Sequence, residues 1–143
     1  MPTPVYPCLW FDGKAHEAAD FYCSVFPNSR LLSRNDFIAV YEINGSRMMN
    51  MNGGPEFTFN EAMSLVISCD TQEEIDYYWE KLTAGGQENK CGWLKDRYGV
   101  SWQVIPSILG PLMNNPATAP KVLYAFMQMK KFIIADLEKA ANS

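Results

Sequence analysis

Residues 63–86 read MSLVISCDTQEEIDYYWEKLTAGG, and this stretch places a short apolar segment directly before an amphipathic helical pattern. The segment from Met63 to Cys69 is rich in apolar and β-branched residues, which predicts a strand. Thr71 and Glu74 have the spacing of a capping box, so a helix is expected to begin just after Thr71. One face of that helix carries the apolar side chains Ile75, Tyr78, Trp79 and Leu82. The glycine pair that closes the stretch is expected to end the helix.

Three more strands are predicted after this helix, near residues 87–90, 93–95 and 100–105. A turn over residues 96–99, which ends in glycine, joins the last two of them. The second half of the chain therefore has the order strand, helix, strand, strand, strand.

The first half of the chain repeats this order. A strand is predicted over residues 5–11, a helix over 15–26, and strands around 30–33, 37–43 and 46–52. Asn44-Gly45 between the last two strands is a strong hairpin signal. The two helices also share residue types at matching offsets: Glu17, Phe21 and Tyr22 in the first, and Glu74, Tyr78 and Trp79 in the second. We therefore expect two similar α/β halves.

A proline-punctuated tail follows the repeat, and we expect one long helix in it, from about Lys121 to Ala141. The chain of residues 1–143 is thus interpreted as a single domain, with module one over 4–54, module two over 61–106 and the helical tail over 107–143. Apolar residues form a broad stripe on the long helix: Val122, Phe126, Met129, Ile133 and Leu137, widened by Leu123, Met127 and Ile134. Either the helix meets another subunit as well as its own domain, giving a homodimer, or it is simply buried on its own domain.

Composition limits the classes of function. The net charge of −4 argues against a nucleic-acid partner. No apolar run reaches the ~20 residues that span a bilayer, so no membrane association is expected. The start of the sequence does not resemble a signal peptide, and the four cysteines are scattered, so a cytoplasmic protein with reduced thiols is expected.

Cys91 follows Lys90, whose ammonium group can activate a thiol, which makes Cys91 a candidate reactive residue.

The segments PCLWFDGKAHEAADFY, NKCGWLKDRYGVSWQVIP and VLYAFMQMKKFIIADLEKA resemble the PhnB-like family, whose members are often labelled 3-demethylubiquinone-9 3-methyltransferase-like. This family belongs to the glyoxalase, bleomycin-resistance and dioxygenase superfamily, also called vicinal oxygen chelate proteins. The likeness covers nearly the whole chain, and its most specific part runs from Cys91 to Pro106. It implies an α+β fold of paired βαβββ modules whose mixed sheets curl into a half-open barrel, with a C-terminal helix. It also implies a pocket on the concave face of the sheet, and homodimers in most relatives.

Metal-dependent relatives place His, Glu or Gln on the first and last strands of the modules, so those positions test for a metal. They correspond here to Val5 or Pro7, to Ser64, to Met49 or Asn50, and to Gln103. Of these residues only Gln103 resembles a ligand type of the family, and an uncharged amide alone binds a divalent ion poorly. The chain has one histidine, His16, which is expected on the polar side of the first helix. We therefore expect no metal and no other cofactor.

Strand alternation predicts which residues would line a pocket instead. Ser64 and Ser68 share one face of their strand with Val66, while Ser101 and Gln103 share one face of theirs with Ile105. We expect the ligand pocket to be lined by Leu9, Phe11, Asn50, Ser64, Ser68, Ser101 and Gln103. Small hydroxyls and an amide among rings suit a partly apolar organic molecule. Equally, these polar groups could only satisfy the local backbone.

Three functions follow from these expectations. The first is binding of a small, partly apolar organic molecule without a catalytic metal. The second is a metal-independent enzyme of unknown reaction that uses Cys91, a tyrosine such as Tyr98, or a substrate-bound cofactor. The third is the methyltransferase that the family label names, although no glycine-rich loop follows a buried strand and opens a helix, the usual setting for a Rossmann-type cofactor.

Overall fold

The chain divides into two units in the computed structural model, which describes residues 2–143. The first unit ends at Phe59 and the second begins at Asn60. Module one (4–54) lies within the first unit, whereas module two (61–106) and the tail (107–143) both lie within the second, and we keep these three names.

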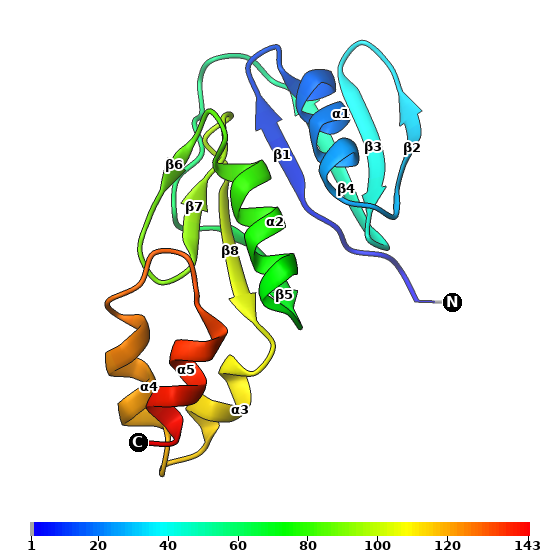
Figure 1. Cartoon of the computed structure of the whole chain (residues 1–143). Coiled ribbons are helices and arrows are strands. Elements are labelled where there is room, and N and C mark those ends of the chain that lie inside the picture. Colours follow the sequence, from blue (N-terminus) through cyan, green and yellow to red (C-terminus); the bar gives the residue numbers. More distant parts are fainter. Residues whose placement is uncertain (1) are drawn as a thin grey trace. The chain divides into compact units, whose positions relative to one another are not determined.

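Module one contains β1 (Cys8–Phe11), α1 (Ala15–Val25), β2 (Ser29–Arg34), β3 (Ile38–Ile43) and β4 (Ser46–Asn52). Its sheet has the order β1-β4-β3-β2, and α1 lies across one face of it (Figure 1). β1 runs parallel to β4, whereas the other neighbours are antiparallel. The parallel pair follows from the crossover through α1, and the antiparallel pairs from short turns.

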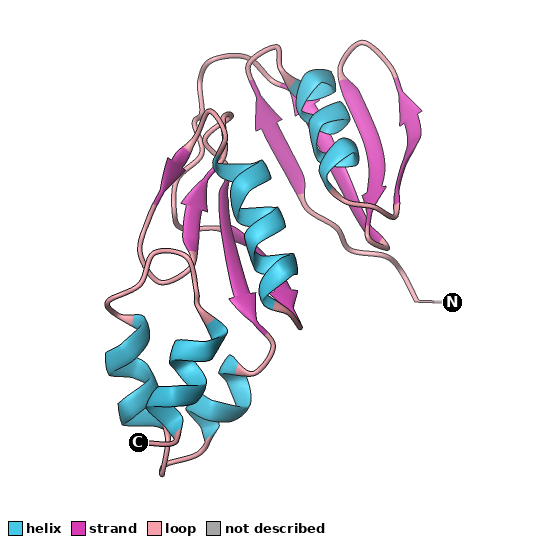
Figure 2. Cartoon of the chain, in the orientation of Figure 1, coloured by secondary structure: helices cyan, strands magenta, loops and turns pink. Residues whose placement is uncertain are grey.

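Module two repeats this plan with β5 (Ser64–Cys69), α2 (Gln72–Thr83), β6 (Gln87–Glu88), β7 (Trp93–Lys95) and β8 (Ser101–Pro106). The sheet order β5-β8-β7-β6 is the counterpart of that in module one. β5 and β8 are the parallel pair, with Ser64 opposite Ser101 and Val66 opposite Gln103. Figure 2 shows the same succession of strands and one helix in both modules. The predicted α+β fold of two βαβββ modules with open mixed sheets is confirmed.

Two local signals of the sequence act as predicted. Asn44 and Gly45 both have positive φ, +46° and +86°, which gives the turn between β3 and β4 the twist that a tight hairpin needs. At the start of α2, the Glu74 amide donates to the Thr71 hydroxyl at 3.2 Å, and Glu74 Oε1 accepts from the Thr71 amide. The capping box therefore satisfies amides that the first helical turn leaves unpaired.

Each helix buries one face of its sheet, and alternation along the strands decides which residues meet it. In module two the buried residues are Cys69, Leu94, Trp102 and Val104 of the sheet, and Ile75, Tyr78, Trp79 and Leu82 of α2. In module one they are Leu9, Phe11, Ala39, Tyr41, Ile43, Met48 and Asn50 of the sheet, and Ala15, Ala18, Ala19, Tyr22 and Val25 of α1. We call the opposite face of each sheet its open face.

The tail differs from the prediction of one long helix over residues 121–141. It forms three short helices, α3 (Leu109–Asn114), α4 (Ala119–Phe126) and α5 (Ile134–Ala141), with α4 packed on the other two (Figure 1). The tail also buries a side chain outside the apolar stripe predicted for the long helix. Phe132, in the connection between α4 and α5, is buried although it does not belong to that stripe.

Hydrogen bonds to module two explain why the helix stops. The carbonyls of Met129 and Lys130 accept from the amides of Cys91 and Gly92, each at 2.8 Å. The Gln72 side chain donates to the Phe132 carbonyl at 2.9 Å and accepts from the Ile134 amide at 2.8 Å. Backbone groups that a continuous helix would pair internally are thus satisfied by another part of the chain.

None of the helices in residues 2–143 has the length and apolar character that a membrane span requires. The four cysteines are free.

Candidate functional site

The open face of the module two sheet brings polar and apolar side chains together in rows that cross the strands. The register places Lys95 opposite Ser101 and Ser101 opposite Ser64, so these three residues form one row. The next row contains Trp93, Gln103 and Val66, and beyond it Ile105 lies opposite Ser68. Alternation puts all of them on the face turned away from α2.

The Ser64–Gln103 pair links the two parallel strands of this face. Gln103 Nε2 donates to Ser64 Oγ at 2.9 Å. The hydroxyl of Ser64 retains a proton to donate, and the amide of Gln103 retains an oxygen that can accept. The pair therefore offers both a donor and an acceptor to a bound molecule.

Ser101 lies in the same row with its hydroxyl unsatisfied. The residue is 1% exposed, and its Oγ has no hydrogen-bond partner in residues 2–143. A buried polar atom without a partner is rare in folded proteins, because its desolvation is not offset. Such an atom on a mixed polar and apolar face marks a position where a ligand oxygen or nitrogen would be favourable.

Lys95 completes the polar row with a positive charge. Its Nζ lies 3.0 Å from Glu61 Oε1, and its side chain is 28% exposed against 59% for Glu61. The hydrogen bond from Lys95, and then its charge, lower the pKa of Glu61. Lys95 therefore has a partner in the isolated chain, but an exposed and easily displaced one.

Three apolar side chains lie beyond the polar row. Val66 is 55% exposed, and Trp93 and Ile105 are half-buried. An exposed valine beside a tryptophan is the kind of surface that the body of an organic molecule can cover. The open face of module two thus has a polar end and an apolar end.

Four of the predicted pocket residues, Ser64, Ser68, Ser101 and Gln103, lie on this open face. The other three do not. Leu9, Phe11 and Asn50 lie on the face of the module one sheet that α1 covers, and they are 6%, 3% and 0% exposed. The parity of β1 and β4 directs these three side chains into the core of module one rather than toward its open face.

Asn50 has a structural role in module one. Its Nδ2 donates to the Ala15 carbonyl at 3.1 Å, and its Oδ1 accepts from the Tyr41 hydroxyl at 2.9 Å. Two positions along β4, Asn52 Oδ1 accepts from the Ala15 amide at 2.9 Å. The two asparagines of β4 therefore anchor the first turn of α1 to the sheet.

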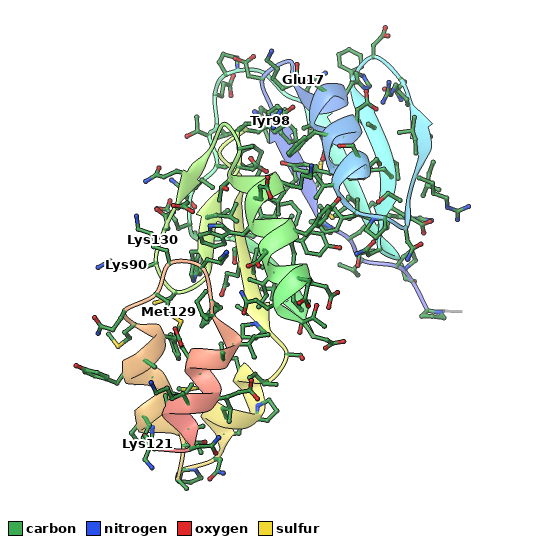
Figure 3. All side chains as sticks on the ribbon, in the orientation of Figure 1. Glu17, Lys90, Tyr98, Lys121, Met129 and Lys130 are labelled. Atoms are coloured by element: carbon green, nitrogen blue, oxygen red, sulfur yellow. The ribbon has the colours of Figure 1, made fainter. Side chains whose placement is uncertain are left out.

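Cys91 and Tyr98, the two candidate catalytic residues, lie at opposite ends of β7. Cys91 precedes the strand, with a positive φ of 59° and its amide bonded to the tail. Tyr98 follows the strand in the turn to β8. Figure 3 shows Tyr98 far from Lys90 and Met129, which mark the Cys91 end. The structure does not bring the two residues together.

Asp96 organises the turn that holds Tyr98. One carboxylate oxygen accepts from the amides of Tyr98 and Val100, and the other accepts from Trp102 Nε1 at 2.8 Å. Asp96 is 3% exposed, so these bonds compensate a buried acid. Asp96 thereby fixes the turn between β7 and β8, and this turn sets the positions of Lys95 at the end of β7 and Ser101 at the start of β8.

The side chains at the predicted metal positions do not suit a divalent ion. Val5 and Pro7 precede β1, Met49 is a thioether on the open face of module one, and Asn50 is occupied in the core. Ser64 and Gln103 are uncharged and bonded to each other. Within residues 2–143, no cluster of three or more His, Cys, Asp and Glu side chains could hold a metal, and His16 lies on α1. Divalent cations favour carboxylates or imidazoles, which this set lacks.

Solved structures share this architecture. A PhnB protein from Bacillus cereus, described as a proposed 3-demethylubiquinone-9 3-methyltransferase, is 35% identical, covers 73% of this chain and 99% of its own, and superimposes with a TM-score of 0.67. A Pseudomonas aeruginosa protein is 19% identical over 73% of this chain and 98% of its own, with a TM-score of 0.63. FosX from Listeria monocytogenes, a fosfomycin resistance protein solved with Mn(II) and sulfate, is 14% identical over 80% and 97%, with a TM-score of 0.61.

The chain therefore has the fold of the glyoxalase and bleomycin-resistance proteins. The model of the family described as 3-demethylubiquinone-9 3-methyltransferase matches residues 3–105. The chain belongs to this PhnB-like family. No curated protein matches it significantly.

Lys95 and Trp93 belong to the site but were not predicted from the sequence. The alternation of the strand could have predicted them, because Trp93 and Lys95 flank Leu94, which is fully buried beneath α2, and so must point to the opposite face. Glu61 could not be found in this way, since it lies in the loop before β5 and only the fold brings it to Lys95.

Proposed function

We propose that this chain binds a small, partly apolar organic molecule on the open face of module two, and that no metal takes part. The observation that carries the proposal is the buried, unpartnered hydroxyl of Ser101 beside the Ser64–Gln103 pair. A ligand that bonds to this hydroxyl would remove the cost of its desolvation. The neutral donors and acceptors around it suit recognition by hydrogen bonds.

The test is nuclear magnetic resonance with two probe molecules, 4-phenylbutyrate and its neutral amide, 4-phenylbutyramide. We expect at least one of them to shift the signals of Val66, Trp93 and Ile105, while Val122, buried in the tail, stays unchanged. If neither probe moves these signals at millimolar concentration, binding at this face is rejected.

A variant that fills the open face of module two tests the location of the binding site without the need to assign resonances. Val66→Trp places a large ring on the open face at a position that is 55% exposed, so the fold should tolerate it. Phe37→Trp in module one, where the side chain is 68% exposed, is the matched control. Probe binding should weaken about tenfold in the first variant and remain unchanged in the second.

Metal independence has its own measurement. We expect elemental analysis of the purified protein to find less than stoichiometric zinc, manganese, nickel and iron, because Ser64 and Gln103 are poor ligands for them. Stoichiometric metal that is lost in Gln103→Ala would overturn this part of the proposal.

The enzyme alternatives remain separate proposals. The family description supports a methyltransferase only as a label, and micromolar binding of S-adenosylmethionine in calorimetry would support it as an activity. Catalysis by Cys91 or Tyr98 would need each residue to act alone, since they lie at opposite ends of β7.

The homodimer also remains a prediction, now with a more specific surface. Leu123 and Tyr124 of α4 and Met127 at its C-cap are 41%, 75% and 56% exposed, and they form an apolar strip that a second subunit would cover. Light scattering at micromolar concentration should give twice the mass of one chain, and a monomer would reject the prediction.

A further inference from the structure

We infer that the ligand of the module two open face is an organic anion, with its charged group between Lys95 and Ser101 and its apolar body extending toward Ile105. This inference rests on the proposed function, which it narrows to a class of ligand. It follows from the order of side chains across the face, from the pairing of Lys95 and from the unpartnered Ser101.

The first step is the charge on the face. Of the residues in β5, β7 and β8 that the register places on the open face, Lys95 is the one that carries a charge. It lies directly across from Ser101, whose hydroxyl can donate a hydrogen bond. An ammonium group beside a hydroxyl donor matches the oxygens of a carboxylate or another oxyanion.

The second step is the availability of Lys95. Its partner in the isolated chain is Glu61, which is 59% exposed and lies in the loop before β5. Ion pairs that involve an exposed carboxylate contribute little to stability, so exchanging Glu61 for a ligand carboxylate is nearly neutral for the fold. The ligand gains the additional hydrogen bond from Ser101, which Glu61 does not make.

The third step is the direction of the apolar body. Ser101 and Ile105 lie four residues apart on β8, a distance of about 13 Å along a strand. Trp93 and Val66 lie in the row between them, on either side of Gln103. An acid whose chain carries one ring has the length to place its carboxylate at Lys95 and its ring against Trp93.

The experiment compares three probes of similar length that differ in charge: 4-phenylbutyrate, 4-phenylbutyramide and 4-phenylbutylamine. Affinities are measured by calorimetry on the wild-type chain and on Lys95→Met, Glu61→Gln and Lys90→Met. Lys90→Met is the matched control, because it removes the same charge from the loop before β7 rather than from the open face.

We expect the wild-type chain to bind the carboxylate about tenfold more tightly than the amide and to bind the amine most weakly. Lys95→Met should abolish this preference, and Lys90→Met should retain it. Glu61→Gln should strengthen carboxylate binding about threefold, because it removes the competing carboxylate.

The outcomes separate the two proposals. If the amide binds as tightly as the carboxylate, the preference for an anion is rejected. If the preference survives in Lys95→Met, the placement of the charged group at Lys95 is rejected. In both cases binding at the face is judged separately by Val66→Trp. If no probe binds the wild-type chain or Glu61→Gln, the proposed function itself fails, and this inference fails with it.

Discussion

Gly92 lies against the ring of Phe132, so closely that a Cβ at position 92 would be 2.5 Å from Cε2 of that ring and 2.8 Å from the carbonyl oxygen of Val104. Phe132 is 1% exposed, and it also contacts Phe126 with ring centroids 5.6 Å apart. The absence of a side chain at Gly92 therefore lets the connection between α4 and α5 dock on module two. This contact lies beside the hydrogen bonds from Cys91 and Gly92 to the carbonyls of Met129 and Lys130, and together they hold the break between α4 and α5.

Gly92→Ala tests this contact. The added methyl group clashes with Phe132, and φ at this position is +80°, so we expect a loss of about 3 kcal/mol in the free energy of unfolding, measured in urea. Gly99→Ala is the control, because φ is +86° there but a Cβ meets open space. The control should cost about 1 kcal/mol. Equal losses in the two variants would show that Phe132 does not crowd position 92.

Gln72→Ala removes both side-chain hydrogen bonds that hold the start of α5. We expect the amide of Ile134 to exchange with deuterium at least tenfold faster, because its acceptor is gone. The free energy of unfolding should fall by about 2 kcal/mol. Gln87→Ala, in exposed β6, is the matched control and should leave the exchange of Ile134 unchanged. Unchanged protection in Gln72→Ala would mean that the tail is held by other contacts.

Asn50→Leu tests whether Asn50 is a core residue rather than a pocket residue. The leucine removes the hydrogen bonds that the Asn50 side chain makes with the Tyr41 hydroxyl and the Ala15 carbonyl, so unfolding should become easier by about 3 kcal/mol. Adding Tyr41→Phe should recover part of this loss, because the hydroxyl that donates to Asn50 is then removed as well. If Asn50 instead belonged to the ligand site, Asn50→Leu would weaken probe binding on the open face of module two and leave the free energy of unfolding unchanged.

Cys69 should react more slowly with a thiol reagent than the exposed Cys8. Cys69 is 1% exposed; burial, followed by the charges of Glu74 and Asp70, raises the pKa of its thiol from 9.0 to about 11. At pH 8 its thiolate is therefore scarce as well as inaccessible. Labelling followed by mass spectrometry should find Cys8 modified first, and faster labelling of Cys69 would contradict its burial.

The same shift in the pKa of Cys69 predicts a loss of stability in alkali. Above pH 9 the unfolded thiol ionises while the folded thiol keeps its proton, so the unfolded state binds fewer protons and the free energy of unfolding falls as pH rises from 9 to about 11. Cys69→Ala should show a smaller decline over this interval. A parallel decline in both proteins would assign the effect to other groups.

Much of the fold was predictable from local pattern, because local chemistry decides it. Thr71 with Glu74 marks the start of α2, and Asn44-Gly45 marks a hairpin, since each motif satisfies or bends its own backbone. The polar residues of the site were also predictable from the sequence, because Ser64 and Gln103 each alternate with apolar neighbours along their strands. Which face of β1 and β4 is covered could not be predicted in this way, since Leu9 and Asn50 become core residues only when α1 lies over them.

The sequence by itself determined the repeated βαβββ order, the family and the shortage of side chains that favour a divalent metal, because these depend on spacing, motif and residue count. Tertiary structure alone decided the break between α4 and α5, where the carbonyls of Met129 and Lys130 bond to another segment instead of continuing a helix. It also decided that Lys95 meets Glu61 and Ser101 on one face. Contacts between residues distant in the chain depend on the register of strands and the path of loops, which no local pattern specifies.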